Sequence, residues 1–185
     1  MAQVEDTNID LEAGGRLTIR SAQPDDLEAV LAFDLEPPDP DDLSSPDVVP
    51  EQHRRATRLH KIEWYQREPG FLYLLALADG NVVGELSFFC RMEPLHRHRG
   101  SFDMFVLPAW RRRGIGRALL ATLLAWARKE PSVEIVGLRV IEADAVAVGL
   151  YRSFGFAEEG RLRRGVKLPS GEYCDDLHMS LHLDK

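Results

Sequence analysis

The spacing of apolar side chains changes from a strand period to a helix period between residues 101 and 127. Phe102, Met104 and Val106 alternate with the intervening positions, as in a half-buried strand. After Pro108, apolar residues recur with helical spacing at Ile115, Leu119, Leu120, Leu123, Leu124 and Trp126. The change falls at Gly114 and Gly116. The pattern therefore predicts a strand, a glycine-containing turn and an amphipathic helix.

The start of this helix has the features of an anion site. The first backbone N–H groups of a helix have no partner inside it, and they form the positive end of the helix dipole. Gly114 and Gly116 lack a β-carbon and allow a ligand to approach the main chain closely. Four cationic side chains surround the same turn, namely Arg111, Arg112, Arg113 and Arg117. We interpret this turn as a pyrophosphate-binding loop.

Three kinds of phosphate-binding loop differ in the residues around their glycines. A magnesium-binding P-loop needs a Lys-Ser or Lys-Thr pair after the glycines, and this sequence has none there. The dinucleotide fingerprint needs a small third residue where Leu119 stands. The remaining pattern, Arg111-x-x-Gly114-x-Gly116 after a strand, resembles the acyl-CoA loop of the GNAT superfamily of N-acyltransferases.

A second stretch strengthens this resemblance. A strand over residues 133–141 is followed by a short helix over residues 144–156, with Gly155 at its end. The pairs Leu150-Tyr151 and Gly155-Phe156 are similar to the second GNAT motif. The family usually has Asn where this chain has Asp144, which puts a direct amide contact to CoA in doubt. Asp is a good N-cap, so the helix should still form.

The resemblance implies an α/β GNAT fold with a central, mixed, mostly antiparallel sheet of about six or seven strands and about four helices on both faces. We expect a flexible tail over residues 1–15 and one domain over residues 16–185. Outside the two motifs, strands are predicted at residues 17–20, 71–78, 82–90 and 172–183, and helices at residues 25–31 and 51–68. Asp79-Gly80-Asn81 indicates a hairpin turn. In the 51–68 helix, we expect solvent exposure for Arg54, Arg55, Arg58, Lys61 and Arg67.

Composition limits the classes of function. A chain of 185 residues with 44% apolar side chains suits one domain, and a formal net charge of −7 argues against general nucleic-acid binding. The longest apolar run, residues 71–78, is too short to cross a membrane. The acidic N-terminus shows no secretory signal, so we expect a cytoplasmic location. Cys90 and Cys174 have no metal-ligand spacing and are expected to be free thiols, and no metal site is predicted.

Residues 34–50 form an acidic, proline-rich stretch that fits no regular element. Two interpretations stay open for it. It could be a solvated surface loop, or it could overhang an acceptor pocket and attract a cationic amine.

The resemblance also implies which residues bind the acyl-CoA and how they act. The expected cofactor-binding residues are Met104, Phe105, Val106, Arg111, Arg112, Arg113, Gly114, Ile115, Gly116, Arg117, Asp144 and Tyr151. The main-chain N–H of Val106 would donate to the thioester oxygen. Tyr151 would protonate the departing thiolate, since its unperturbed pKa of about 10 is near that of a thiol. The alternative role for Tyr151 is to anchor its helix to the sheet.

The group that deprotonates the acceptor amine is less well defined by the sequence. By alternation, His98 shares a strand face with Met104 and Val106, and its imidazole could accept a proton near neutral pH. Glu85 and Asp103 are alternatives on neighbouring strands, and a chain of water molecules could replace all three.

The function implied is transfer of an acetyl group from acetyl-CoA to a primary amine by direct attack. The acceptor could be an amino acid, a small cationic amine or a peptide N-terminus, and a longer acyl group is open. A CoA-binding sensor or scaffold without turnover is an alternative, suggested by Asp144. A nucleotide-binding oxidoreductase is a third possibility. Homodimers are common in the family, although no feature of this sequence decides the oligomeric state.

Overall fold

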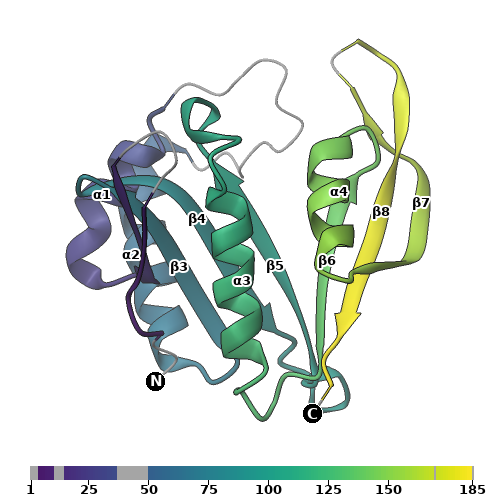
Figure 1. Ribbon diagram of the computed structural model, residues 1–185, viewed down its shortest axis with the longest axis horizontal. Helices are drawn as coiled ribbons and strands as arrows, with labels where there is room; N and C mark the ends of the chain where they lie inside the picture. Colours follow the sequence, from purple (N-terminus) through teal and green to yellow (C-terminus); the bar gives the residue numbers. More distant parts are fainter. Residues whose placement is uncertain (1–3, 11–14, 37–49, 169, 185) are drawn as a thin grey trace.

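The computed structural model describes residues 4–10, 15–36, 50–168 and 170–184. Eight strands form one sheet in the order β1-β2-β3-β4-β5-β6-β8-β7 (Figure 1). All neighbouring strands are antiparallel except β5 and β6. The strands are β1 (Thr7–Asp10), β2 (Arg16–Ser21), β3 (Phe71–Ala78), β4 (Asn81–Cys90), β5 (Arg99–Val106), β6 (Ile135–Ile141), β7 (Ala157–Lys167) and β8 (Tyr173–His182). The predicted mixed, mostly antiparallel sheet is therefore confirmed.

The sheet has more strands than the six or seven expected. Strand β1 lies within residues 1–15, where we expected a flexible tail, and it pairs with β2. Strand β7 includes residues 161–167, which are rich in arginine and where we predicted no strand, and it pairs with β8. Both are the outermost strands of the sheet, and most of their side chains are exposed. Backbone pairing, rather than an apolar face, places them there.

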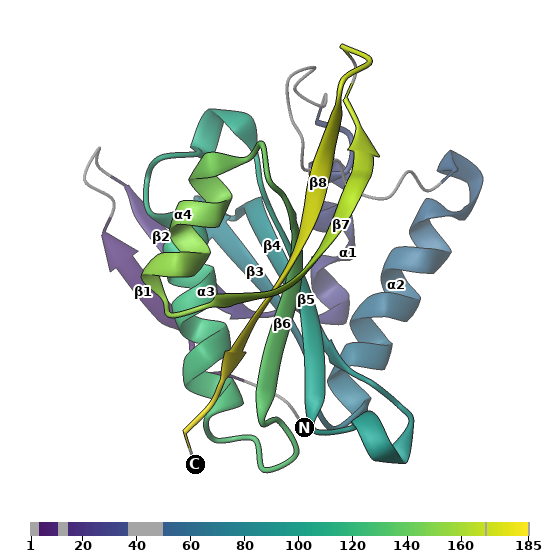
Figure 2. The ribbon, with the colours of Figure 1, turned by 90° about the vertical axis from the view of Figure 1, so that its right-hand side faces the viewer.

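Four α-helices cover the two faces of the sheet, as predicted, and Figure 2 shows α2 on the opposite side from α3 and α4. Side chains of α3 and α4 pack in one core cluster, and side chains of α1 and α2 pack in a second. The helices are α1 (Leu27–Phe33), α2 (Glu51–Arg67), α3 (Ile115–Ala127) and α4 (Ala145–Ser153), with short 3₁₀ turns η1 (Pro24–Asp26), η2 (Pro94–His96) and η3 (Pro108–Trp110).

The centre of the sheet follows from local sequence. All eight residues of β3 are buried, as expected for an apolar strand covered on both faces. Asp79 and Gly80 both have positive φ angles, of 49° and 82°, which a two-residue hairpin turn requires. The predicted hairpin between β3 and β4 is confirmed.

Strands β5 and β6 pair over only three residues and then separate. The pairs are Arg99 with Ile135, Gly100 with Val136, and Ser101 with Gly137. A β-carbon on Gly100 would lie 2.1 Å from Cζ of Phe88, so only glycine fits at this pair. Beyond Ser101 the two strands diverge, as Figure 1 shows. The sheet therefore opens at the carboxyl end of β5.

Candidate active site

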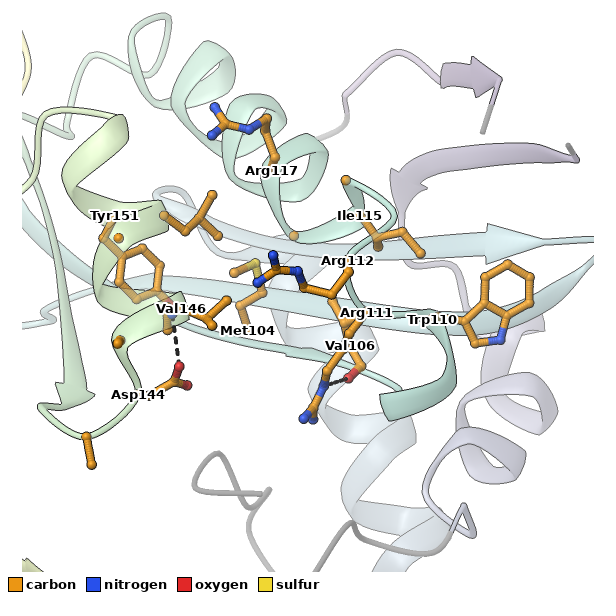
Figure 3. Close-up of a pocket in the computed structure, with 17 residues that line it drawn as sticks. Met104, Val106, Trp110, Arg111, Arg112, Ile115, Arg117, Asp144, Val146 and Tyr151 are labelled. Carbon is orange, nitrogen blue, oxygen red and sulfur yellow. Dashed lines mark hydrogen bonds between the residues drawn. The ribbon is translucent and has the colours of Figure 1, made fainter. Parts of the chain in front are cut away.

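A cleft of about 830 Å³ lies where β5 and β6 separate, within the range usual for ligand sites (Figure 3). In Figure 3, Met104 lies at its centre, with Ile115 of α3 and Tyr151 of α4 on opposite sides. Ten of the twelve predicted cofactor-binding residues line it, namely Met104, Val106, Arg111, Arg112, Gly114, Ile115, Gly116, Arg117, Asp144 and Tyr151. The fold thus brings the two sequence motifs together.

Two of the predicted cofactor-binding residues lie elsewhere. Phe105 is on the opposite face of β5, where its ring packs edge-on against Phe33 with centroids 5.7 Å apart. The guanidinium of Arg113 stacks over the ring of Trp110, 4.8 Å from its centroid. Neither side chain lines the cleft.

Sequence reasoning missed most of the α4 side of the cleft. Besides Trp110, the additional lining residues are Ala143, Ala145, Val146, Ala147, Gly149 and Leu150. Several of them lie three or four residues from one another or from Tyr151, on one face of a helix. That helical spacing is the signal that could have identified them.

The loop before α3 holds the backbone in the geometry of an anion site. Gly114 is the N-cap with a φ angle of 82°, and Arg112 also has a positive φ of 61°. The Ala118 N–H donates to the Gly114 carbonyl at 3.0 Å, so the N–H groups at 115–117 precede the first helical bond. These donors lie beside the cleft, next to the arginines. Their arrangement suits a phosphate group.

Two arginines of this loop connect elements of the site. The Arg111 Nε donates to the Val106 carbonyl oxygen at 3.0 Å, which ties the loop to the end of β5 (Figure 3). The Arg117 Nη2 donates to Ser153 Oγ at 3.1 Å, and its guanidinium lies over Phe154. Arg117 therefore links the start of α3 to the end of α4 across the cleft.

The N–H of Val106 points toward the opening in the sheet. The neighbouring Leu107 N–H donates to the Val83 carbonyl of β4 at 3.0 Å. Successive residues of a strand direct their N–H groups to opposite sides, so the Val106 N–H faces β6. Because β6 no longer pairs with β5 beyond Ser101, this donor faces the gap.

Tyr151 lies in an apolar part of the cleft. Its side chain packs edge-on against Phe102 and Phe156, with ring centroids 5.7 and 6.0 Å away. Burial raises the pKa of the Tyr151 phenol, and the carboxylates of Asp144 and Asp103 raise it further. The phenol therefore keeps its proton at neutral pH and can serve as a proton donor.

Asp144 forms the N-cap that the sequence predicted. Its carboxylate accepts a hydrogen bond from the Ala147 N–H at 2.9 Å, at the start of α4 (Figure 3). The substitution of Asp for the usual Asn therefore keeps the helix start that borders the cleft.

Comparison with known proteins identifies the family of the chain. The model of the acetyltransferase (GNAT) family matches residues 35–156, which include the cleft and both motifs. The chain belongs to the GNAT acetyltransferase family. Its resemblance to an N-acyltransferase family is thereby confirmed, and GNAT homologues bind acetyl-CoA as the acyl donor.

Several relatives of this GNAT enzyme act on amino acids or amines according to their names. It is 31% identical to the L-amino acid N-acetyltransferase AaaT of Escherichia coli, over 63% of this chain and 74% of the relative. It is 25% identical to phosphinothricin N-acetyltransferase of Alcaligenes faecalis, over 90% and 83%. Among solved structures, YncA of Salmonella typhimurium, with its cofactor acetyl-CoA, has a TM-score of 0.74 at 26% identity, covering 91% and 95%.

On the other face of the sheet, this GNAT enzyme has a buried polar cluster that we define as Asp34, Arg58, Lys61, Tyr73 and Glu85. Arg58 makes a bidentate ion pair with Asp34, and its Nη1 lies 3.3 Å from Glu85. The Tyr73 hydroxyl donates to Glu85 at 2.5 Å. We expected Arg58 to be exposed, but its side chain is only 12% exposed and lies between Asp34, just after α1, and Glu85 of β4.

Glu85, one of the proposed bases, is an ionised and fully engaged carboxylate. Burial opposes its ionisation, but the cations Lys61 and Arg58 and the hydrogen bond from Tyr73 outweigh burial and hold the pKa of Glu85 below its ordinary value. Glu85 pairs with Phe105 across β4 and β5, on the sheet face opposite the cleft. A carboxylate with a lowered pKa attracts a cation better than it removes a proton.

His98 lies at the opposite end of β5 from the cleft. It directly precedes β5, whereas Val106 is the last residue of that strand. Eight residues of extended chain separate the two by about 26 Å. The His98 carbonyl accepts hydrogen bonds from Glu134 and Ile135 at the paired end of β5 and β6. The structure therefore does not bring His98 to the other predicted site residues.

For the part of the chain that the structure describes, three further observations concern its cysteines, potential metal ligands and helices. Cys90 is buried, Cys174 is partly buried, and neither forms a disulfide. No group of three or more potential metal ligands occurs among the described residues. In the same residues, every helix is too short or too polar to cross a membrane. The acidic stretch lies mostly at 37–49, outside the described residues.

Proposed function

We propose that this GNAT enzyme acetylates the primary amine of an amino acid or a closely related small amine. The observation that carries the proposal is the cleft, in which the α3 N-terminus, the Val106 N–H and Tyr151 border one space. The names of its relatives support an amino-acid acceptor. Acetyl-CoA, when bound, supplies the thioester that the amine attacks.

The residues of the cleft fit a pyrophosphate and a thioester. The N–H groups at the start of α3, with Arg112 and Arg117, would hold the phosphates. Gly116 has no β-carbon to cover its main chain. A β-carbon there would point toward the cleft residues Met104 and Leu150, at 3.5 Å and 3.6 Å. The Val106 N–H would donate to the carbonyl oxygen as negative charge develops on it.

Proton transfer in this proposal uses two residues. Tyr151 gives its proton to the departing sulfur, because its phenol stays neutral and lies in the cleft. Asp103 accepts the proton of the acceptor ammonium, directly or through water, because it is exposed on the sheet face opposite the cleft. Glu85 is not assigned the role of base, because it is buried, its pKa is lowered, and Arg58 and Tyr73 already hold its carboxylate.

The decisive experiment measures thiol release from acetyl-CoA with a panel of L-amino acids, polyamines and short peptides. We expect release with one or more amino acids and a stabilising thermal shift with acetyl-CoA. The free energy of unfolding that ligand binding adds grows with ligand concentration. It reaches about 2.7 kcal/mol when the ligand is at roughly 100 times its Kd. A shift without release from any acceptor would favour the CoA-binding sensor, an alternative that no described contact of Asp144 or Tyr151 supports.

Three further expectations stay proposals. We propose a cytoplasmic enzyme, a possible homodimer, and acetyl rather than a longer acyl group as the cargo. Light scattering after size-exclusion chromatography measures the oligomeric state. Competition between acetyl-CoA and longer acyl-CoA thioesters in the thiol-release assay measures acyl preference.

A further inference from the structure

Lys61 is a half-buried cation whose ammonium has no carboxylate partner in contact. Its Nζ lies 4.5 Å from the centroid of the Tyr73 ring and 5.9 Å from that of Tyr65. Among the residues that the structure describes, no ion pair or hydrogen bond to Lys61 occurs. A partly desolvated ammonium without such a partner is unfavourable and is suited to receive an anionic group.

The other charges of the polar cluster already contact one another. Arg58 contacts the carboxylates of both Asp34 and Glu85, and Glu85 also accepts the Tyr73 hydroxyl. The negative charges of Glu85, Asp103 and Asp34 favour the protonated form of Lys61. Burial nevertheless lowers the pKa of Lys61, and the charge of Arg58 adds to this effect. The two carboxylates and two cations of the cluster balance in charge, but both carboxylates contact Arg58, and neither contacts the Lys61 ammonium.

Lys61 lies on the same face of the sheet as the proposed acceptor side. Tyr73, Ser87 and Asp103 are directly opposite one another on β3, β4 and β5. Adjacent strands are about 4.8 Å apart, so two spacings place Tyr73 about 10 Å from the strand that borders the gap. The row of paired residues Tyr73, Ser87 and Asp103 therefore has a cation at one end and an anion at the other. The cation is Lys61, over the Tyr73 ring, and the anion is Asp103 of β5.

We propose that Lys61 binds the carboxylate of an amino-acid acceptor and so directs its amine toward Asp103 and the end of β5. The inference rests on the proposed function and narrows its acceptor to amines that also carry a carboxylate. An amino acid is a zwitterion. In this arrangement its carboxylate would face Lys61 and its ammonium would face Asp103. An ammonium–carboxylate hydrogen bond is among the stronger polar contacts in proteins.

The test measures binding of N-acetyl amino acids, which keep the carboxylate but need no turnover. N-acetyl-L-methionine, N-acetyl-L-phenylalanine and N-acetyl-L-glutamate are compared with their α-carboxamides by calorimetry in the presence of CoA. We expect the wild-type protein to bind at least one acid about 10- to 100-fold more tightly than its amide. The Lys61→Met variant should lose this preference, and Lys61→Arg should keep part of it.

A matched control is Arg67→Met, which removes an exposed cation from the same helix and should leave the preference unchanged. If only N-acetyl-L-glutamate binds and its α-carboxamide binds equally well, the side-chain carboxylate is the group that Lys61 contacts, and Lys61→Met should weaken both. Equal binding of every acid by wild type and Lys61→Met, or no binding of any acid, would overturn the inference.

The experiments distinguish a failure of the role proposed for Lys61 from a failure of the proposed acetyltransferase function. A protein that prefers acids through Lys61 but releases no thiol from acetyl-CoA contradicts the proposed function and supports this inference. A protein that acetylates amino acids and their carboxamides with equal kcat/KM supports the function and overturns the role of Lys61.

Discussion

Arg58 shows that the polarity of a single residue does not determine its burial. The charged pattern of α2 predicts exposure, yet the Arg58 side chain lies between Asp34 and Glu85. These partners are 24 and 27 residues away in sequence, on other elements. No periodicity within the helix contains that information, so the polar cluster could not be predicted from the sequence.

Removing the charge of Arg58 should strongly destabilise the fold. In Arg58→Met, two buried carboxylates lose their cation, and breaking a buried pair in this way costs about 3–5 kcal/mol of the free energy of unfolding. Urea denaturation followed by circular dichroism measures the loss. The control is Arg55→Met, one helical turn before Arg58 on α2. It removes only an exposed ion pair with Glu28 and should change stability little. Equal effects of the two variants would contradict the importance of the cluster.

Tyr151→Phe should reduce turnover without disturbing the fold. The ring contacts with Phe102 and Phe156 remain, while the proton donor is lost, and general acid catalysis contributes roughly 100-fold or more. We expect kcat to fall by about that factor with the KM for acetyl-CoA nearly unchanged, measured by thiol release. Tyr173→Phe, an exposed tyrosine on β8, is the control. An unchanged kcat in Tyr151→Phe would leave Tyr151 only the helix-anchoring role.

The contrast between Tyr151 and His98 shows which site residues the sequence could predict. Tyr151 belongs to a short motif on a helix beside the cleft, so local sequence is enough to bring it to the cleft. The alternation of apolar residues predicts which face of the strand His98 lies on. It does not predict at which end of the strand the sheet opens. That end is set by the pairing of β5 with β6, which a single strand pattern does not reveal.

At the level of elements, the sequence predicts those with a strong apolar period. The helix α3 and the strands β3 and β4 have continuous or periodic apolar positions, and the structure places them within a few residues of their predicted bounds. The edge strands β1 and β7 have no apolar face, since nearly all their side chains are exposed. Their existence depends on backbone hydrogen bonds to a neighbouring strand.

Gly116→Ala should separate the role of the α3 start in binding from its role in folding. The added methyl would make only ordinary contacts with Met104 and Leu150, and Ala favours a helix over Gly by up to about 1 kcal/mol. Stability should therefore be kept, while the affinity for acetyl-CoA falls by about 10-fold, because the methyl enters the space next to the main chain. Calorimetry and thermal unfolding measure the two quantities. An unchanged affinity would place the phosphates elsewhere.

At the level of the whole molecule, stability should decline at both ends of the pH scale. Burial raises the pKa of Tyr65 to about 12 and raises those of Tyr73 and Tyr151, so folding keeps these phenols neutral. Above about pH 10 the unfolded chain releases these protons and the folded chain does not, which favours unfolding. Asp26 and Glu85 have lowered pKa values, so their stabilisation is present above about pH 4 and is lost as pH falls further.

The melting temperature, measured between pH 3 and pH 11, checks the predicted loss of stability at acidic and at alkaline pH. We expect a plateau of the melting temperature near neutral pH and a fall at each end. A melting temperature that rises between pH 10 and pH 11 would contradict the burial of the tyrosines.

The three residue pairs between β5 and β6 also have a mechanical consequence. Strands β1 to β5 and strands β6 to β8 are joined along this short seam, α3 packs on β2 to β5, and α4 lies beside β6 and β8 (Figure 1). Because only three residue pairs join the two groups of strands, we expect this junction to be where they move most easily relative to each other. A ligand that contacts both helices should restrain this motion, so we expect the enzyme to be more rigid with the ligand bound than without it.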